Sequence, residues 1–268
     1  MAPKPEVRRS PVAALLYGAP IGLLGGLIGL GGAEFRLPVL AGVFGYSARR
    51  AVALNLAISL ITVVSALLIR GGSLSLVPLV GLLPVIVAMI AGAVSAAYLG
   101  AALVHSVSER LLERIILVFL VVIGSALIVE AFLPQDVPGL LPAWPLLRLV
   151  AAMIFGVGIG LVSSLLGVAG GELIIPTLVF AFGAGIKTAG TASLLVSFPT
   201  VAVGVLRHHR IGSFTDRTDL TQTVAPMGVG SVVGAVVGGL LVGVVPAAVL
   251  KLALGVILIV SAVRIFYR

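Results

Sequence analysis

Two glutamates are the residues of this sequence best placed to do chemistry. Glu34 and Glu172 lie in apolar stretches, each just after a glycine cluster and four residues before a proline, Pro38 or Pro176. The other seven acidic residues lie in predicted loops, at segment ends or near the N-terminus. A charged side chain at the centre of a membrane costs about 2.5–3.5 kcal/mol on insertion scales, which makes both glutamates functional candidates. We expect them to act in proton coupling or substrate gating, to cap broken helices at their starts, or both.

Arg36 is the basic residue nearest to these acids, and it has two interpretations. It lies two residues beyond Glu34, which is not the same face of a regular helix. It either pairs with Glu34 at an irregular turn, or it is a fixed positive charge for an anionic substrate.

Two polar stripes repeat the same spacing in different apolar segments. Residues at i, i+4 and i+7 share one face of a helix, so each stripe lines a transport pathway or bonds neighbouring helices. The stripes are Asn55, Ser59 and Thr62, and Ser193, Ser197 and Thr200.

Glycine pairs precede both glutamates and predict irregular backbone there. The pairs are Gly31 and Gly32, and Gly170 and Gly171. Irregular backbone at membrane depth is tolerated where it is buried in protein or lines a cavity. Free N–H groups at the start of a half-helix favour an anion, so we count these glycines as candidate substrate-binding positions.

Other chemistries lack the residues that they need. The chain has no cysteine and only three histidines, which makes thiolate chemistry impossible and a histidine-rich metal site unexpected. It shows no Ser/His/Asp constellation and no phosphate-binding P-loop. We therefore predict no enzyme activity, no cofactor and no resident metal.

Composition indicates a membrane protein. The 268 residues are 60% hydrophobic and 10% charged, whereas soluble domains are about 45–50% apolar and about 25% charged. The net charge of +8 comes from cations in short gaps between apolar runs, which argues against nucleic acid as a partner. Most runs reach the roughly 20 residues that a spanning helix needs; residues 33–45 and 172–183 do not, and we expect half-helices there.

The chain contains an internal repeat. Residues 29–62 align without a gap on residues 167–200, with eleven of the 34 pairs identical, including the glutamate and the proline of each motif. We infer a duplicated unit: a first membrane repeat over residues 11–133, an extracytoplasmic linker over 134–143, and a second repeat over 144–268. Positions paired by extending this gapless alignment in both directions are called equivalent below.

Charge distribution favours opposite orientations of the two repeats. If each is a re-entrant hairpin followed by three spans, twelve Lys and Arg residues lie on the N-terminal side and four on the other. If each broken segment is one continuous span, the split is ten to six. The positive-inside rule favours the first arrangement. We predict an all-α membrane protein of two inverted repeats, with about eight full spans, or ten segments counting half-helices, and both termini cytoplasmic.

The duplicated motif resembles one known family. Gly-Leu-Gly-Gly-Ala-Glu-Phe-Arg-Leu-Pro-Val-Leu at 29–40, echoed by Gly-Val-Ala-Gly-Gly-Glu-Leu-Ile-Ile-Pro-Thr-Leu at 167–178, is similar to the TauE/SafE sulfite exporter family. The resemblance covers nearly the whole chain and implies a secondary transporter of small sulfur-containing anions such as sulfite, thiosulfate or sulfonates. Glu34 and Arg36 depart from the plainest form of the family motif, which leaves the substrate of this subfamily open.

We therefore predict an alternating-access carrier in a bacterial-type inner membrane, with Glu34 and Glu172 as proton-coupling candidates. Its partners are a small anion and membrane lipid; a homo-oligomer remains open. An anion channel and a membrane anion sensor are the alternatives. Counterflow distinguishes a carrier from a pore, and saturable binding without flux would favour the sensor.

Overall fold

The computed structural model describes residues 10–28, 32–71, 77–132, 139–214, 216–240 and 247–266, and over these ranges it is helical without strands. Six helical stretches are long and apolar enough to cross a membrane. This confirms the predicted all-α membrane architecture. The six stretches are Ala48–Leu68, Leu79–Val104, Glu109–Val129, Pro145–Leu166, Thr188–Arg210 and Arg217–Gly238.

The elements follow one another through short connections. In the first half they are α1 (Pro11–Ile28), α2 (Ala33–Pro38), η1 (Val39–Val43), α3 (Ala48–Gly71), η2 (Val77–Leu82), α4 (Leu83–Ser106) and α5 (Glu109–Glu130). In the second half they are α6 (Pro145–Leu166), α7 (Gly171–Pro176), η3 (Thr177–Ala181), α8 (Ile186–Arg210), α9 (Arg217–Asp219), η4 (Leu220–Val224), α10 (Ala225–Leu240) and α11 (Ala247–Phe266).

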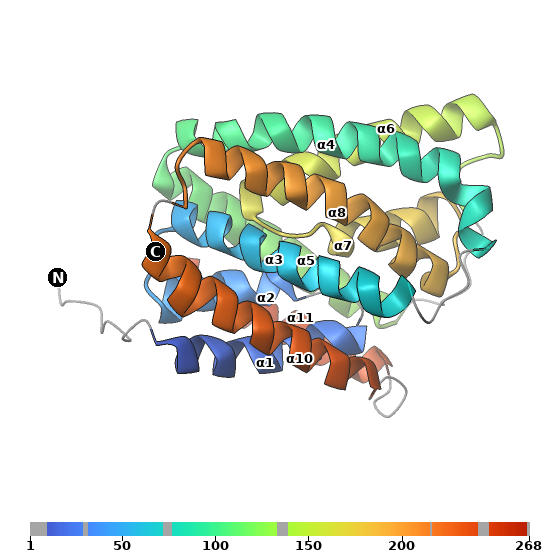
Figure 1. The fold of residues 1–268 in the computed structure, drawn as a ribbon. Helices are drawn as coiled ribbons and strands as arrows, with labels where there is room; N and C mark the ends of the chain where they lie inside the picture. The colour runs from blue at the N-terminus through green and yellow to red at the C-terminus, as the bar shows by residue number, and fades with distance from the viewer. Residues whose placement is uncertain are drawn as a thin grey trace.

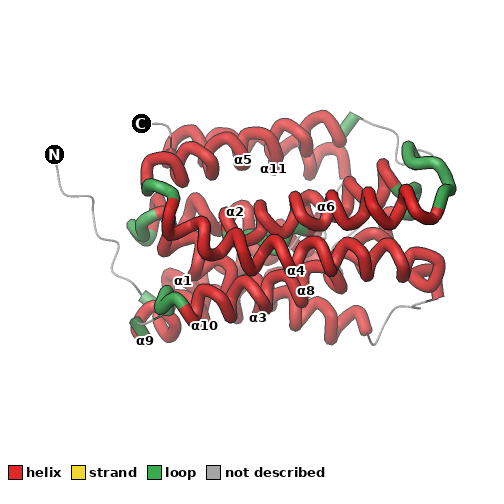
Figure 2. The backbone as a smooth tube through the Cα atoms, turned by 90° about the horizontal axis from the view of Figure 1, so that it is seen from above, coloured by secondary structure: helices red, strands yellow, loops and turns green. Residues whose placement is uncertain are grey.

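The long helices run side by side, and the two termini lie at the same end of the bundle (Figure 1). We call this the terminal end, and the other the opposite end. α3 begins at the terminal end, whereas α8 begins at the opposite end, so these neighbouring helices are antiparallel (Figure 1). α5 and α11 form a pair along one side of the bundle (Figure 2).

Glycines let two helix pairs approach backbone to backbone. A Cβ atom on Gly22 of α1 would overlap the carbonyl oxygen of Ser231 in α10, and one on Gly160 of α6 would overlap that of Ala93 in α4. Small residues permit such close packing between membrane helices. The contacts recur at equivalent positions of the repeat, so each half packs its first helix on the third long helix of the other. The recurring pairs are Gly18–Met227 with Gly156–Met89, and Gly22–Ser231 with Gly160–Ala93.

Two short helices fold back against the long helices that precede them. α2 with η1 returns along α1, where Tyr17 and Phe44 meet edge to face at 6.0 Å. α7 with η3 returns along α6, where Phe155 and Phe182 meet in the same way at 6.3 Å. These aromatic pairs again occupy equivalent positions. We call the two structures the first and the second hairpin; they open toward opposite ends of the bundle.

A proline shapes the middle of each returning segment. Pro38 and Pro176 have no N–H to donate, and a π-helical turn follows each of them. The returning helices span residues 33–43 and 171–181, close to the half-helices expected at 33–45 and 172–183. The hydrogen bond from Tyr46 N to the Leu40 carbonyl, 3.1 Å, has its counterpart in Ala184 N to Leu178, 3.0 Å.

Candidate functional site

The tips of the two hairpins position the glutamates. Gly32 and Gly170 stand immediately before α2 and α7 with φ of 72° and 83°, a left-handed conformation that favours glycine. Each tip then places its glutamate in the first turn of a short helix. In the second tip, Ser163 Oγ donates to the Val168 carbonyl at 2.6 Å and ties the turn to α6.

Glu34 and Glu172 come together from different halves of the chain. Glu34 is fully buried and Glu172 is 5% exposed. The four carboxylate oxygens are buried and have no hydrogen-bond partner among the described residues. The two side chains are close enough to interact electrostatically. Two buried acids therefore face the same small region.

Arg36 is fully buried and bonds to α3. Its Nε donates to Asn55 Oδ1 and one of its terminal nitrogens donates to Ser59 Oγ, both at 2.9 Å. Asn55 Nδ2 in turn donates to the Ala33 carbonyl at 2.9 Å. Arg36 thus joins the first hairpin to the first polar stripe through neutral acceptors. Ile174 stands at the equivalent position of the second half, so this link exists in one half alone.

Three further stripe residues are buried and bond within their own helices. Thr62 Oγ1 donates to the Ser59 carbonyl, Ser193 Oγ to Gly190, and Thr200 Oγ1 to Val196. Their hydroxyl oxygens keep acceptor capacity, whereas their protons are used locally. Since α3 packs directly on α8, both stripes belong to the central layer of the bundle. Ser197 is 2% exposed in the same layer.

The structure thus brings most predicted site residues into one buried region. Arg36, Asn55 and Ser59 form one hydrogen-bonded group, with Glu34 and Glu172 beside it. Gly32 and Gly170 precede the short helices, and Gly171 is the first residue of α7. Gly31 lies outside the described residues.

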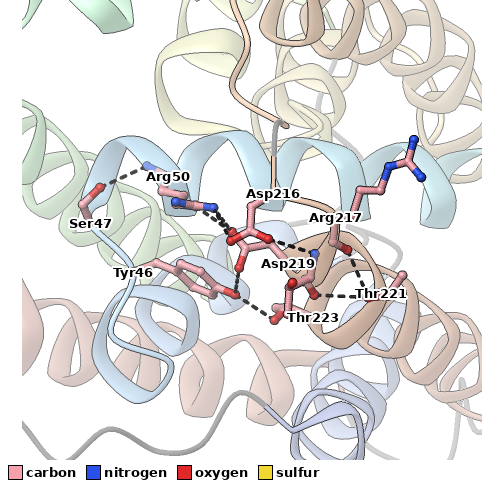
Figure 3. A network of polar contacts seen from close by, with 9 residues as sticks. Tyr46, Ser47, Arg50, Asp216, Arg217, Asp219, Thr221 and Thr223 are labelled. Atoms are coloured by element: carbon pink, nitrogen blue, oxygen red, sulfur yellow. Dashed lines mark hydrogen bonds and ion pairs between the residues drawn. The ribbon is translucent and has the colours of Figure 1, made fainter.

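A second polar cluster at the terminal end went unnoticed in the sequence (Figure 3). Asp219 was counted among the acids in loops or at segment ends, and its side chain is only 2% exposed. Its carboxylate accepts from Tyr46 Oη at 2.9 Å and from Arg50 Nε at 2.6 Å. Tyr46 also shares a 2.9 Å hydrogen bond with Thr223. Arg50 additionally reaches the more exposed Asp216 at 3.2 Å. We call Tyr46, Arg50, Asp219 and Thr223 the terminal latch.

The terminal latch ties the start of α3 to the segment that leads into α10, and so connects the two halves. Its equivalent positions in the repeat are Ala184, Thr188, Gly81 and Val85, which bear no charge. This asymmetry is the sequence signal that would have revealed the latch, because three of its four polar residues align with apolar residues in the other half.

The central region can bind an ion or move a proton. It combines two carboxylates, one guanidinium, one amide and several hydroxyls in an environment shielded from water. No group of three or more His, Cys, Asp or Glu side chains suited to a metal occurs among the described residues. An apolar furrow of about 500 Å³ lies elsewhere, between α5 and α6, with Arg114 on its lining.

Comparisons with known proteins identify the chain's relatives. The model of the family described as Sulfite exporter TauE/SafE matches residues 1–127 and 152–268. A probable membrane transporter protein of Methanocaldococcus jannaschii is 32% identical over 124 residues, which cover 44% of this chain and 45% of the relative. The alignment thus spans less than half the length of that relative. No solved structure matches the chain.

Proposed function

Because the chain belongs to the Sulfite exporter TauE/SafE family, we propose that it is a secondary active transporter of small sulfur-containing anions, working by alternating access. One observation carries the proposal: two hairpin tips from different halves bring two buried, unpartnered glutamates and Arg36 to one place. Broken helices whose ends meet inside the membrane are a recurrent substrate site of secondary transporters. The relative named as a probable membrane transporter supports the same class.

The anion binds between the hairpin tips in this proposal, near Glu34, Arg36 and Glu172. Hydroxyl groups of both stripes replace part of its hydration shell. The burial of this region favours a carrier over an open pore, because a pore would leave its lining residues accessible to water. The hydroxyl candidates are Ser59, Thr62, Ser197 and Thr200, each at most 8% exposed.

The two halves are inverted copies in this proposal, each a re-entrant hairpin followed by three membrane-spanning helices. Three features support inversion: α3 and α8 run antiparallel, the hairpins open toward opposite ends, and helix contacts recur at equivalent positions. An odd number of crossings per half turns the second copy over. The terminal end is the cytoplasmic side of an inner membrane, as the distribution of basic residues favours.

Transport into liposomes tests the proposal. Purified protein is reconstituted, and uptake of labelled sulfite, sulfate, thiosulfate, taurine and sulfoacetate is followed with and without a pH gradient. We expect saturable uptake of at least one sulfur anion, with counterflow of labelled against unlabelled substrate. Empty liposomes and a reconstituted triple variant, Glu34→Gln/Arg36→Gln/Glu172→Gln, are the controls.

If folded protein takes up none of the five labelled compounds, the proposed substrate class is wrong. Flux without saturation or counterflow would overturn the carrier mechanism and favour a channel. Uptake by the triple variant equal to that of the unaltered protein would show that the anion is handled elsewhere in the chain.

A further inference from the structure

The two glutamates carry more negative charge, when both are ionised, than Arg36 can neutralise. Glu34 and Glu172 are buried, and their four carboxylate oxygens accept no hydrogen bond from the described residues. With both acids ionised, they and Arg36 together carry a net charge of −1. Such a region repels an anion, and two unsolvated like charges side by side are unfavourable.

Among the described residues, the surrounding elements bring no further charge that is shown beside the two acids. Arg36 is close enough to both glutamates to interact with them electrostatically. α1 carries no charged residue between Pro11 and Ile28, and α3 meets this region with Asn55 and Ser59. The described charges of α11 are Lys251 in its first two turns and Arg264 in its last. Those of α8 are Arg207 and Arg210 in its last turn.

We infer that Glu34 and Glu172 act as one carboxylic dyad that holds a shared proton, and that the anion binds to the protonated dyad only. This inference rests on the proposed function and specifies its coupling. A proton added to one carboxylate makes a carboxylic acid, which donates a hydrogen bond to the other acid or to the anion. The charge of the dyad and Arg36 then rises from −1 to zero or, with a second proton, to +1. Each anion therefore travels with at least one proton in the same direction.

A metal cation is a poorer occupant because the neighbouring oxygens are already engaged. Asn55 Oδ1 and Ser59 Oγ both accept from Arg36, and a cation next to that guanidinium would meet a like charge. Hard cations take several oxygen ligands, whereas a proton needs one acceptor and leaves the other carboxylate as its partner.

Infrared difference spectroscopy tests the dyad without any anion. Reconstituted protein should show the C=O stretching band of a protonated carboxylic acid, shifted in D₂O. Glu34→Gln and Glu172→Gln should each abolish it, because each variant removes one partner. Glu113→Gln, an acid near the start of α5, should leave it unchanged. The inference is overturned if both single variants keep the band or if the unaltered protein lacks it. It is also overturned if added NaCl removes the band, because a cation would then occupy the site in place of the proton.

Proton uptake on anion binding tests the coupling. Sulfite or thiosulfate is added to weakly buffered, purified protein, and a pH-sensitive dye reports the protons taken up. We expect about one proton or more for each anion bound, and none with either Glu→Gln variant. Anion binding without proton uptake overturns the coupling and leaves transport intact. If none of the anions binds, the proposed function fails. The infrared band then still shows whether Glu34 and Glu172 hold a shared proton. Thermal unfolding of each variant shows that it is folded.

Discussion

Arg36 organises the centre of the molecule at the scale of single residues. Its guanidinium holds two neutral side chains of α3 at once, and Asn55 passes the link on to the backbone at the start of α2. A buried guanidinium requires such partners because an unpaired charge in an apolar region is strongly unfavourable. The first hairpin is thereby fixed to α3, whereas the second has Ile174 at this position.

Replacing the amide partner should reveal this difference. Asn55→Ala leaves Arg36 Nε without its acceptor and should lower the free energy of unfolding by about 1–3 kcal/mol. Ser193→Ala, at the equivalent position, removes a bond within its own helix and should cost less. Thermal unfolding in detergent, followed by circular dichroism, measures both. Equal melting temperatures for the two variants would contradict the structural role assigned to Arg36.

At the scale of the helices, close packing depends on which face of a helix carries glycine. Gly160 of α6 lies against the backbone of α4, whereas a Cβ atom on Gly158 of the same helix would meet nothing within 4 Å. The helix is therefore not uniformly sensitive to substitution. Only the face of α6 that packs on α4 requires glycine, because a side chain there would separate the two helices.

Two alanine substitutions in α6 test this view. Gly160→Ala should separate α6 from α4 and destabilise the protein by about 1–3 kcal/mol, as overpacking does. Gly158→Ala should be neutral or stabilising, because alanine favours a helix over glycine by about 0.5–1 kcal/mol. Melting temperatures of the purified variants decide between them. A stable Gly160→Ala variant would mean that α4 and α6 have room for an additional methyl group at this contact.

The terminal latch belongs to the same scale, since it fastens α3 to the segment before α10. Its core is the ion pair between Arg50 and the buried Asp219. Asp216 makes the outer contact with Arg50, where both side chains are 39% exposed. Exposed ion pairs contribute about 0–1 kcal/mol, so the buried acid should dominate.

Weakening the latch should loosen the terminal end. Asp219→Asn should speed the labelling of a cysteine placed at the buried Val52, because α3 begins next to Arg50. Asp216→Asn, the matched control, should leave the rate nearly unchanged. The measurement is the rate of maleimide labelling in membranes, and no native cysteine competes with the added one because the sequence contains none. Equal rates in both variants would rule out that the ion pair between Arg50 and Asp219 fastens α3 to the segment before α10.

At the scale of the whole molecule, the hairpins open toward opposite ends. Ser47 and Gly185 follow the first and the second hairpin at equivalent positions of the repeat, and both are exposed. A Cβ atom on Gly185 meets nothing within 4 Å. These two positions therefore report directly on the orientation of each half.

Single cysteines at these positions should be labelled from opposite sides of the membrane. Ser47→Cys should react with an impermeant maleimide added to one side, and Gly185→Cys with reagent added to the other. Right-side-out and inverted vesicles give both measurements for each variant. Reaction of both cysteines from the same side would contradict the inverted arrangement and favour continuous spans through the broken segments.

The sequence alone determined the class of protein and much of its central site. Its apolar runs predicted a helical membrane protein, because a backbone inside lipid must satisfy its own hydrogen bonds. The internal repeat places Glu34 and Glu172 at equivalent positions, and acids are rare in apolar segments of this kind. Glycine and proline located the broken helices closely, because both act on the local backbone.

Tertiary structure decided what depends on contacts between distant segments. The partners of Arg36, 19 and 23 residues away, and the burial of Asp219 beside Tyr46, 173 residues away, follow from how the helices pack. The sequence left Arg36 either paired with Glu34 at an irregular turn or facing an anionic substrate, and the structure adds two neutral acceptors on α3. Local pattern sets which segments are helices and where they break; which side chain meets which depends on the packing of the assembled bundle.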